Sequence, residues 1–335
     1  APRHLHFASH PRGAPQGGLV MPPATLVSVD LDDLACYHAI HGLAAPPRQV
    51  AGVGLEQWLP RFLELFARLD VRATFFVIGR DLARDLDARG AGAELLRRAL
   101  AAGHELGNHG FSHAYDLVRW SAPRQREDLR ACDALLRELG AEVQGFRAPG
   151  YTHDRPLLRQ VAALGYRYDS SSLPSPTYYA AKLAAIGTMA LRGERSSSQV
   201  RGAPAFVGRR LPYYRSDVGL WELPMSVSPV ARVPLIGTTL LALPALVSGP
   251  LRAIALKLPH LHLELHGMDL LDADEDALPE ALRARQPDLR VPLAKRLRAL
   301  SEVLDSLRAD REVLPLCAVA EQLQRRGHLR PHKRD

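Results

Sequence analysis

Cysteine and lysine are both scarce in this sequence. The 335 residues include three cysteines, Cys36, Cys132 and Cys317. An odd count without a CxxC pair excludes a cysteine-based zinc module and a small disulfide-stapled domain. Only four of the 43 basic residues are lysines, so the net charge of +7 comes almost entirely from arginines. These arginines are dispersed among Ala, Leu and Glu without a nucleic-acid-binding pattern, and we therefore expect no nucleic-acid partner.

A long uninterrupted apolar run is also missing. The most apolar segment, residues 230–258, contains three prolines and two arginines. Its unbroken part, residues 233–247, is shorter than the roughly 20 residues that cross a bilayer. The first residues lack the apolar core of a signal peptide. We expect a cytoplasmic protein and leave open a peripheral membrane contact through residues 230–258.

The sequence alternates short β-like runs with helical ones. Strands are expected at residues 25–30, 72–79, 104–108, 143–147, 166–169, 220–224, 261–266 and 313–316. Helices are expected between them, for example at 55–69, 81–103, 123–139 and 154–164, and finally at 292–307 and 319–326. This order is typical of βα units with a parallel sheet. We predict an α/β fold, a distorted (β/α) barrel of about seven strands.

The predicted domain is single and covers residues 24–327. An irregular arm, residues 1–23, precedes it, and a basic tail, residues 328–335, follows. Residues 170–260 are expected to form a variable insertion region that includes the apolar segment. Within it, residues 170–219 are interpreted as a loop with one helical piece near residues 179–191. Residues 272–287 are expected to form a loop.

Polar candidates stand at the ends of the predicted strands. Asp30, Arg147, Asp169 and His266 end four of these strands, and His109 follows another. Since the carboxyl ends of barrel strands gather on one face, these five side chains are predicted to share a site.

Two short segments contain possible metal ligands. His109 and His113 would lie on one face of a helical turn. Asp30 and Asp32 are two apart and would point the same way from a strand, with Asp33 pointing away. Two imidazoles and one carboxylate make a three-ligand site with a position left for water. Asp33 remains the alternative carboxylate.

These segments, in this order, resemble the polysaccharide deacetylases of the NodB-homology kind, carbohydrate esterase family 4. The first motif looks like a DxD variant, Asp30-Leu-Asp32, and the second resembles His109-Gly-Phe-Ser-His113, with Gly in place of Ser or Thr. The third resembles Arg147-Ala-Pro-Gly150. Looser matches are Tyr168-Asp-Ser-Ser171 and Leu263-Glu-Leu-His266.

The resemblance implies a role for each of these residues. Asp32, His109 and His113 would hold a divalent ion, with Zn²⁺ favoured. Asp30 would be the general base and His266 the general acid, with His262 or His153 as alternative acids. Arg147 would orient Asp30, and Asp169 would orient His266. The backbone at Gly150 and Tyr151 would bind the substrate oxyanion.

The implied activity is removal of an N-acyl group, acetyl or formyl, from an amino sugar. The sugar could belong to a polysaccharide or to a lipid carrier, and the apolar segment at residues 230–258 favours the carrier. One alternative is an allantoinase-like hydrolase of a non-sugar amide. Another is a non-catalytic binding protein on the same fold.

Overall fold

The computed structural model describes residues 23–46, 52–200, 208–276 and 278–328. The predicted arm therefore lies outside the described residues except for Pro23. Of the predicted tail, only His328 is described, as the last residue of a helix.

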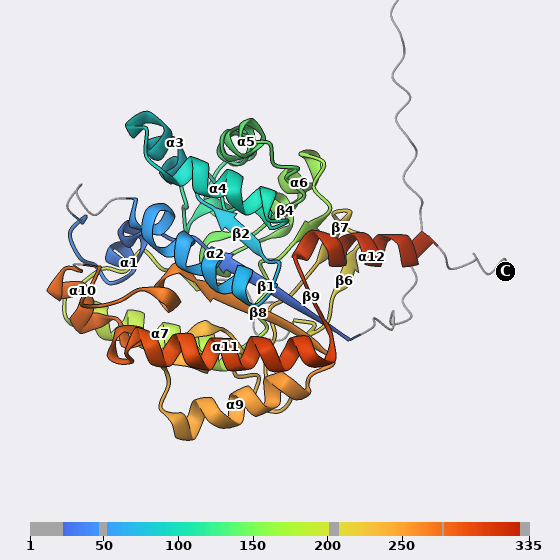
Figure 1. Ribbon diagram of the computed structural model, residues 1–335. Coiled ribbons are helices and arrows are strands. Elements are labelled where there is room, and N and C mark those ends of the chain that lie inside the picture. Colours follow the sequence, from blue (N-terminus) through green and yellow to red (C-terminus); the bar gives the residue numbers. More distant parts are fainter. Residues whose placement is uncertain (1–22, 47–51, 201–207, 277, 329–335) are drawn as a thin grey trace, which may run out of the picture.

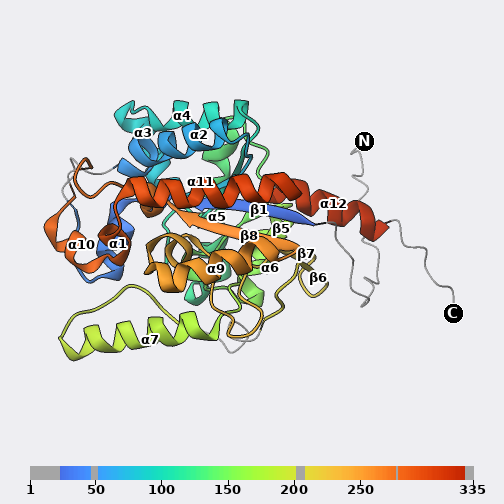
Figure 2. The ribbon, with the colours of Figure 1, turned by 60° about the horizontal axis from the view of Figure 1, so that its bottom comes forward.

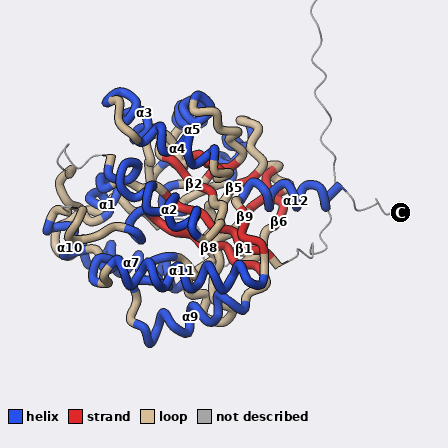
Figure 3. Tube along the Cα trace, in the orientation of Figure 1, coloured by secondary structure: helices blue, strands red, loops and turns tan. Residues whose placement is uncertain are grey.

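The described part of the chain forms one nine-stranded sheet, in the order β6-β7-β5-β4-β3-β2-β1-β8, with β9 pairing with β1. All pairs are parallel except β6 with β7. Strands lie in the centre of the molecule, among the helices (Figure 3). The strands are β1 (Ala24–Asp30), β2 (Thr74–Val77), β3 (Glu105–Asn108), β4 (Gly145–Phe146), β5 (Tyr168–Asp169), β6 (Tyr213–Arg215), β7 (Leu220–Glu222), β8 (His260–His266) and β9 (Glu312–Leu314).

Helices cover both sides of this sheet (Figure 1). They bury apolar stripes against it; in α2, for example, Phe62 and Phe66 are fully buried and pack on Phe75 of β2. The helices are α1 (Leu34–Ile40), α2 (Leu59–Arg68), α3 (Gly79–Ala88), α4 (Gly92–Ala101), α5 (Ala122–Glu138), α6 (Arg155–Ala163), α7 (Pro176–Leu191), α9 (Ala245–Lys257), α10 (Glu280–Arg285), α11 (Leu293–Asp310) and α12 (Leu316–His328).

The sheet curls because the chain beyond β7 turns back toward β8. Ser226 N donates to His262 O at 3.2 Å, and His262 N donates to Ser226 Oγ at 2.8 Å. These two bonds bring the β7 side of the sheet against β8. The result is a curled half-barrel, which confirms the predicted α/β barrel-like fold.

Four details differ from the sequence-based expectation. The sheet has nine strands instead of about seven, because short strands such as β6 lack an apolar run. The helix expected at residues 55–69 starts as a π-turn, Gly54–Trp58, and becomes α-helical only around Pro60, which favours a helix start. Helix α10 lies within the segment expected to be a loop, residues 272–287. The apolar segment at residues 230–258 contains α9, in which Pro250 lies inside the helix.

Candidate active site

The last residues of β1 and β8 place two proton-transfer candidates side by side. Asp30 and His266 are direct register partners on these neighbouring parallel strands. Glu264, two residues earlier on β8, points to the same face because side chains alternate along a strand. One ligand-type atom of each of these three residues lies within 4.8 Å of the others. The strand pairing itself therefore assembles this acidic and imidazole cluster.

Arg147, directly after β4, is fully buried at the centre of the site. Its Nη1 donates to Asp30 Oδ1 at 2.6 Å, and its Nη2 donates to Ser28 Oγ at 2.9 Å and to Ser170 Oγ at 3.0 Å. Its Nε donates to Ser170 O at 2.9 Å. The bond to Oδ1 leaves Asp30 Oδ2 on the side of His109, 3.8 Å from His109 Nε2. The structure thus brings Arg147 and Asp30 together in the predicted pair.

Asp32, His109 and His113 converge on one point. Asp32 Oδ1 lies 3.3 Å from His109 Nε2 and 3.2 Å from His113 Nε2. His109 Nδ1 lies 2.8 Å from Arg147 O, an acceptor, so Nδ1 carries the ring proton and the Nε2 lone pair faces Asp32. Asp32 Oδ1 and His113 Nε2 are buried without a hydrogen-bond partner among the described residues. Two imidazole nitrogens and a carboxylate oxygen that converge in this way are typical ligands of Zn²⁺, so this set of atoms fits a divalent metal ion.

The two histidines are positioned by a loop, which corrects the expectation of a helical turn. Gly110 has φ +77° and His113 has φ +51°, both in the left-handed region. The Asp128 carboxylate accepts from Phe111 N at 2.9 Å and from Ser112 N at 3.0 Å. Glycine is the residue that adopts this backbone most easily, so Gly110 suits this loop.

Asp33 has a structural position instead of a ligand position. Its Oδ1 accepts from Leu34 N at 2.8 Å and caps α1. Its Oδ2 accepts from Gly52 N at 3.0 Å and from Arg84 at 2.6 Å. With both oxygens bonded to donors, Asp33 is not available to a metal, and this favours Asp32 as the carboxylate ligand.

Cys36 contacts the ring nitrogen of His113 that does not face Asp32. Its Sγ lies 3.4 Å from His113 Nδ1, and burial, together with the charge of Asp32, raises the pKa of the thiol well above its usual value. A partner on the second ring nitrogen is typical of metal-binding histidines, because it fixes the ring for the first.

Carboxylates surround His266. Its Nδ1 lies 3.2 Å from Glu264 Oε1, and its backbone N–H donates to Asp269 Oδ2 at 2.8 Å. Burial opposes protonation of the ring, but the charges of Glu264 and then Asp30 outweigh it and raise the pKa of His266 to about 9. The surrounding carboxylates therefore favour the protonated form of His266. Glu264 was missed by the sequence analysis, although the two-residue alternation before His266 pointed to it.

Three of the candidates lie elsewhere. Asp169 was expected to orient His266, but its Oδ1 accepts from Ser171 Oγ at 2.6 Å and its carboxylate clusters with His153 and Glu222. The carboxylate that contacts the His266 ring is that of Glu264, on the same strand. His262, an alternative acid, is buried beside Arg147, and burial and that charge lower its pKa to about 3. His153, the other alternative, belongs to the Asp169 cluster.

The predicted oxyanion loop is a short 3₁₀ turn, Pro149–Tyr151. Tyr151 N already donates to Ala148 O at 3.0 Å, which leaves Gly150 as the backbone donor of the two. The Tyr151 hydroxyl donates to Glu264 Oε1 at 2.9 Å. Helix α7 lies against this turn, since Lys182 Nζ donates to Gly150 O at 3.3 Å and burial lowers the pKa of Lys182 to about 8.

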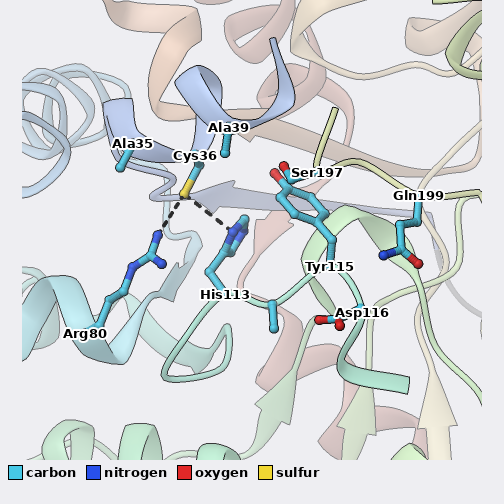
Figure 4. Close-up of a pocket in the computed structure, with 10 residues that line it drawn as sticks. Ala35, Cys36, Ala39, Arg80, His113, Tyr115, Asp116, Ser197 and Gln199 are labelled. Carbon is cyan, nitrogen blue, oxygen red and sulfur yellow. Dashed lines mark hydrogen bonds between the residues drawn. The ribbon is translucent and has the colours of Figure 1, made fainter. Parts of the chain in front are cut away.

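A pocket of about 410 Å³ opens beside His113. In Figure 4, Cys36 lies between Arg80 and His113 on one side, and Tyr115, Ser197 and Gln199 stand on the other. Ser197 and Gln199 belong to the segment after α7, which is bound to α1 through Ser197 N and Ala39 O at 3.1 Å. The volume is within the range of about 300–1,000 Å³ typical of small-molecule sites.

Part of the chain is similar to proteins of a known family. Residues 51–168 match the family model for polysaccharide deacetylase. The match covers 118 of the 335 residues, so this part of the chain is similar to polysaccharide deacetylases. The matched residues include His109, His113, Arg147 and Gly150, whereas Asp30, Asp32 and His266 lie outside them and are assigned from the geometry.

Two curated relatives match part of the chain. It is 31% identical to a chitin deacetylase of Colletotrichum lindemuthianum over 36% of this chain and 47% of that protein. It is 27% identical to a peptidoglycan deacetylase of Helicobacter pylori over 43% of this chain and 47% of that protein. The matches thus span about half the length of these relatives.

One solved structure supports the fold. A protein of Mycobacterium smegmatis assigned to the polysaccharide deacetylases superposes with a TM-score of 0.59 at 19% identity, covering 96% of this chain and 97% of that one.

The contrast between Asp32 and Asp33 can be tested by a pair of substitutions. We expect Asp32→Ala to lose one bound metal ion per chain, because two imidazoles alone bind far more weakly. Asp33→Ser keeps a capping oxygen but loses the bonds to Gly52 and Arg84, and should retain the ion while losing about 1–2 kcal/mol of stability. Metal content after dialysis and urea unfolding measure the two effects. Loss of the ion only in Asp33→Ser would reverse the assignment.

Proposed function

We propose that this chain is a metal-dependent hydrolase that removes an acetyl or formyl group from the nitrogen of an amino sugar. The observation that carries the proposal is the joint placement of Asp30, His266 and the Asp32–His109–His113 triad at the carboxyl ends of neighbouring strands. A base, an acid and a metal-ligand set are what hydrolysis of an unactivated amide requires. The two curated relatives are named as deacetylases of chitin and of peptidoglycan, both polymers of acylated amino sugars.

The residues divide the reaction among them. Asp32, His109 and His113 would hold the divalent ion, with Zn²⁺ favoured; when bound, such an ion polarises the acyl oxygen and makes water more acidic. Asp30, fixed by Arg147 through one oxygen, accepts the proton of the attacking water on the other. The Gly150 N–H donates to the oxyanion that develops on the acyl group. His266 donates its proton to the departing nitrogen, which leaves as a neutral amine.

The complete set of groups argues against the alternative of a non-catalytic binding protein. Such a protein would be expected to lack a ligand, the base or the acid. Here each is present, and Glu264 and Arg147 hold the acid and the base in place. Among the described residues, no contact specifically favours a non-sugar amide as the substrate.

The surface around α7 supports a lipid-linked sugar as the substrate. The inner side of α7 contacts the site through Tyr178, whose ring lies 5.7 Å from that of Tyr151, and through Lys182, its single charged residue. Its outer side is apolar and exposed, with Leu191 90% exposed. Val230, 94% exposed, lies next to the start of α7, because Arg232 O accepts from Ser175 Oγ.

Two arginines border this apolar surface. Arg210 donates to Pro229 O at 3.1 Å and Arg232 donates to Gly208 O at 3.0 Å, so both lie beside Val230. Apolar side chains flanked by arginines suit an anionic membrane surface. The helices found within the described ranges are all too short or too polar to span a bilayer. We therefore propose a peripheral contact at a membrane, with the apolar part of a lipid carrier lying along α7.

The membrane contact can be tested on vesicles containing phosphatidylglycerol. We expect Leu183→Glu together with Leu191→Glu to weaken vesicle binding by about tenfold, since apolar contacts are lost and like charges are added. Hydrolysis of a soluble N-acyl amino sugar should not change. Ala101→Glu on α4, which lies on the opposite side from α7 (Figure 2), is the control. Equal vesicle binding by the wild type, the double leucine variant and Ala101→Glu would contradict a lipid-linked substrate and favour a polymer.

The role of Asp30 separates metal binding from turnover. Asp30→Asn still accepts a hydrogen bond from Arg147 but cannot take the proton of water. We expect unchanged metal content and activity lower by roughly 10²–10⁴-fold on an N-acetyl or N-formyl amino sugar. If the variant instead loses the ion, Asp30 is a ligand and the base must be another group.

The role of His266 is visible in the pH dependence of kcat/KM. Activity needs the protonated ring, so it should fall as the pH rises through the His266 pKa, about 9 in the free protein. Glu264→Gln removes the nearest negative charge, and we expect this alkaline limb to move down by roughly one pH unit or more.

His266→Ala gives the matched control for this assignment. It should abolish the alkaline limb and slow hydrolysis of an N-acyl sugar more than that of a matched aryl ester, whose leaving group needs no proton. An unmoved limb in Glu264→Gln would assign the titration to a different group.

A further inference from the structure

A second cluster of ligand-type side chains lies at the same edge of the sheet, at the ends of β5 and β7. Asp169 and Glu222 are the last residues of these strands and are direct register partners. Their side chains therefore leave neighbouring parallel strands on the same face. His153 comes from the loop after β4, the other neighbour of β5. One donor atom of each of the three residues lies within 4.8 Å of the others.

Each of these side chains is fixed by one polar atom and leaves another without a partner. Asp169 Oδ1 accepts from Ser171 Oγ at 2.6 Å, and Glu222 Oε1 accepts from Ser172 N at 3.1 Å. His153 Nε2 lies 3.5 Å from Ser172 Oγ. The remaining atoms, His153 Nδ1, Asp169 Oδ2 and Glu222 Oε2, are buried with no hydrogen-bond donor or acceptor bonded to them in the part of the chain that is described.

The negative charges of Asp169 and Glu222 are not balanced by a cation bonded to them among the described side chains. Asp169 and Glu222 are both fully buried, and burial and then the charge of Asp169 raise the pKa of Glu222 well above its usual value. Arg215 on β6 is close enough to act on Glu222, but its own hydrogen bond at 3.3 Å goes to Asp217. Two adjacent buried carboxylates must either share a proton or bind a cation.

We propose that His153, Asp169 and Glu222 form a second site for a divalent transition-metal ion. Three atoms free to act as ligands, one imidazole nitrogen and two carboxylate oxygens, suit Zn²⁺ or Mn²⁺. The ion neutralises both carboxylates and occupies the position at which the three unpartnered atoms meet. None of its ligands belongs to the Asp32–His109–His113 triad, so the two sites fill independently.

The position of this site indicates a structural function. Its ligands come from two strands and from the loop that follows the Pro149–Tyr151 turn. A bound ion therefore ties this loop, with Gly150 and Tyr151, to the ends of β5 and β7. Such a link would hold the oxyanion turn in position without contacting the substrate.

Metal stoichiometry and thermal unfolding of the full chain test the proposal. After saturation with Zn²⁺ or, separately, Mn²⁺ and removal of free ion, we expect two ions per chain. His109→Ala should retain one ion, and Glu222→Gln should also retain one, while the protein with both changes should retain none. His153→Ala, in a partly exposed loop position, gives a second variant if Glu222→Gln fails to fold. Added metal should raise the Tm of His109→Ala but not that of the double variant.

The outcomes separate this site from the proposed catalytic centre. One ion in the wild type and none in His109→Ala would overturn the second site and leave the first intact. An unchanged two-ion content in both Glu222→Gln and His153→Ala would place the second ion elsewhere. A third outcome is one ion in the wild type together with a Tm of metal-free Glu222→Gln above that of the metal-free wild type. It would show that the two carboxylates share a proton, and it would also overturn the proposal.

Discussion

The bond between Arg147 and Asp30 is the interaction on which the site depends. Arg147 is fully buried, and its guanidinium is bonded to Asp30, Ser28 and Ser170, so it connects β1, β4 and the end of β5. Its carbonyl oxygen accepts from His109 Nδ1 and so turns Nε2 toward Asp32. Removing one partner of such a buried pair typically costs about 3–5 kcal/mol, because a charge is left without compensation. One residue thus orients the base, selects the histidine tautomer and joins three strands.

Much of the fold could be predicted because most strands are short apolar runs, and the segments between them have apolar residues at helical spacing. The positions of β1, β2, β3 and β8 follow directly from the sequence. The strands predicted at residues 143–147 and 166–169 are present, but β4 and β5 are only two residues long. Strand β6, Tyr213–Arg215, has no apolar run and was not predicted. Its existence depends on β7, which offers it backbone partners, and a sequence pattern does not contain that information.

The candidate site shows the same division. Because parallel strands end at one edge of a sheet, the strand ends predicted that Asp30, His109, Arg147 and His266 lie close together. Which carboxylate faces which imidazole depends also on the lateral order of the strands and on loops. Asp32 faces His109 and His113, whereas Asp169 lies with His153 and Glu222. Asp169 ends β5, which pairs with β7 and is separated from β8 by the four strands β4, β3, β2 and β1. Its register partner is therefore Glu222 on β7. The left-handed backbone at Gly110 and His113 likewise follows from contacts with Asp128 that spacing alone does not reveal.

The in-register pairing of Asp30 with His266 has a consequence for how this protein can change. Neighbouring strands lie about 4.8 Å apart, and the backbone hydrogen bonds fix that repeat. The span between the group that accepts a proton and the group that gives one is therefore a property of the sheet. Loops around the pocket, including the segment after α7, can lengthen or exchange residues to admit a different sugar without altering that span. A slip of one residue between β1 and β8 would turn one of the two side chains to the opposite face. Substitutions that change the substrate specificity are therefore tolerated far better than those that change the strand register.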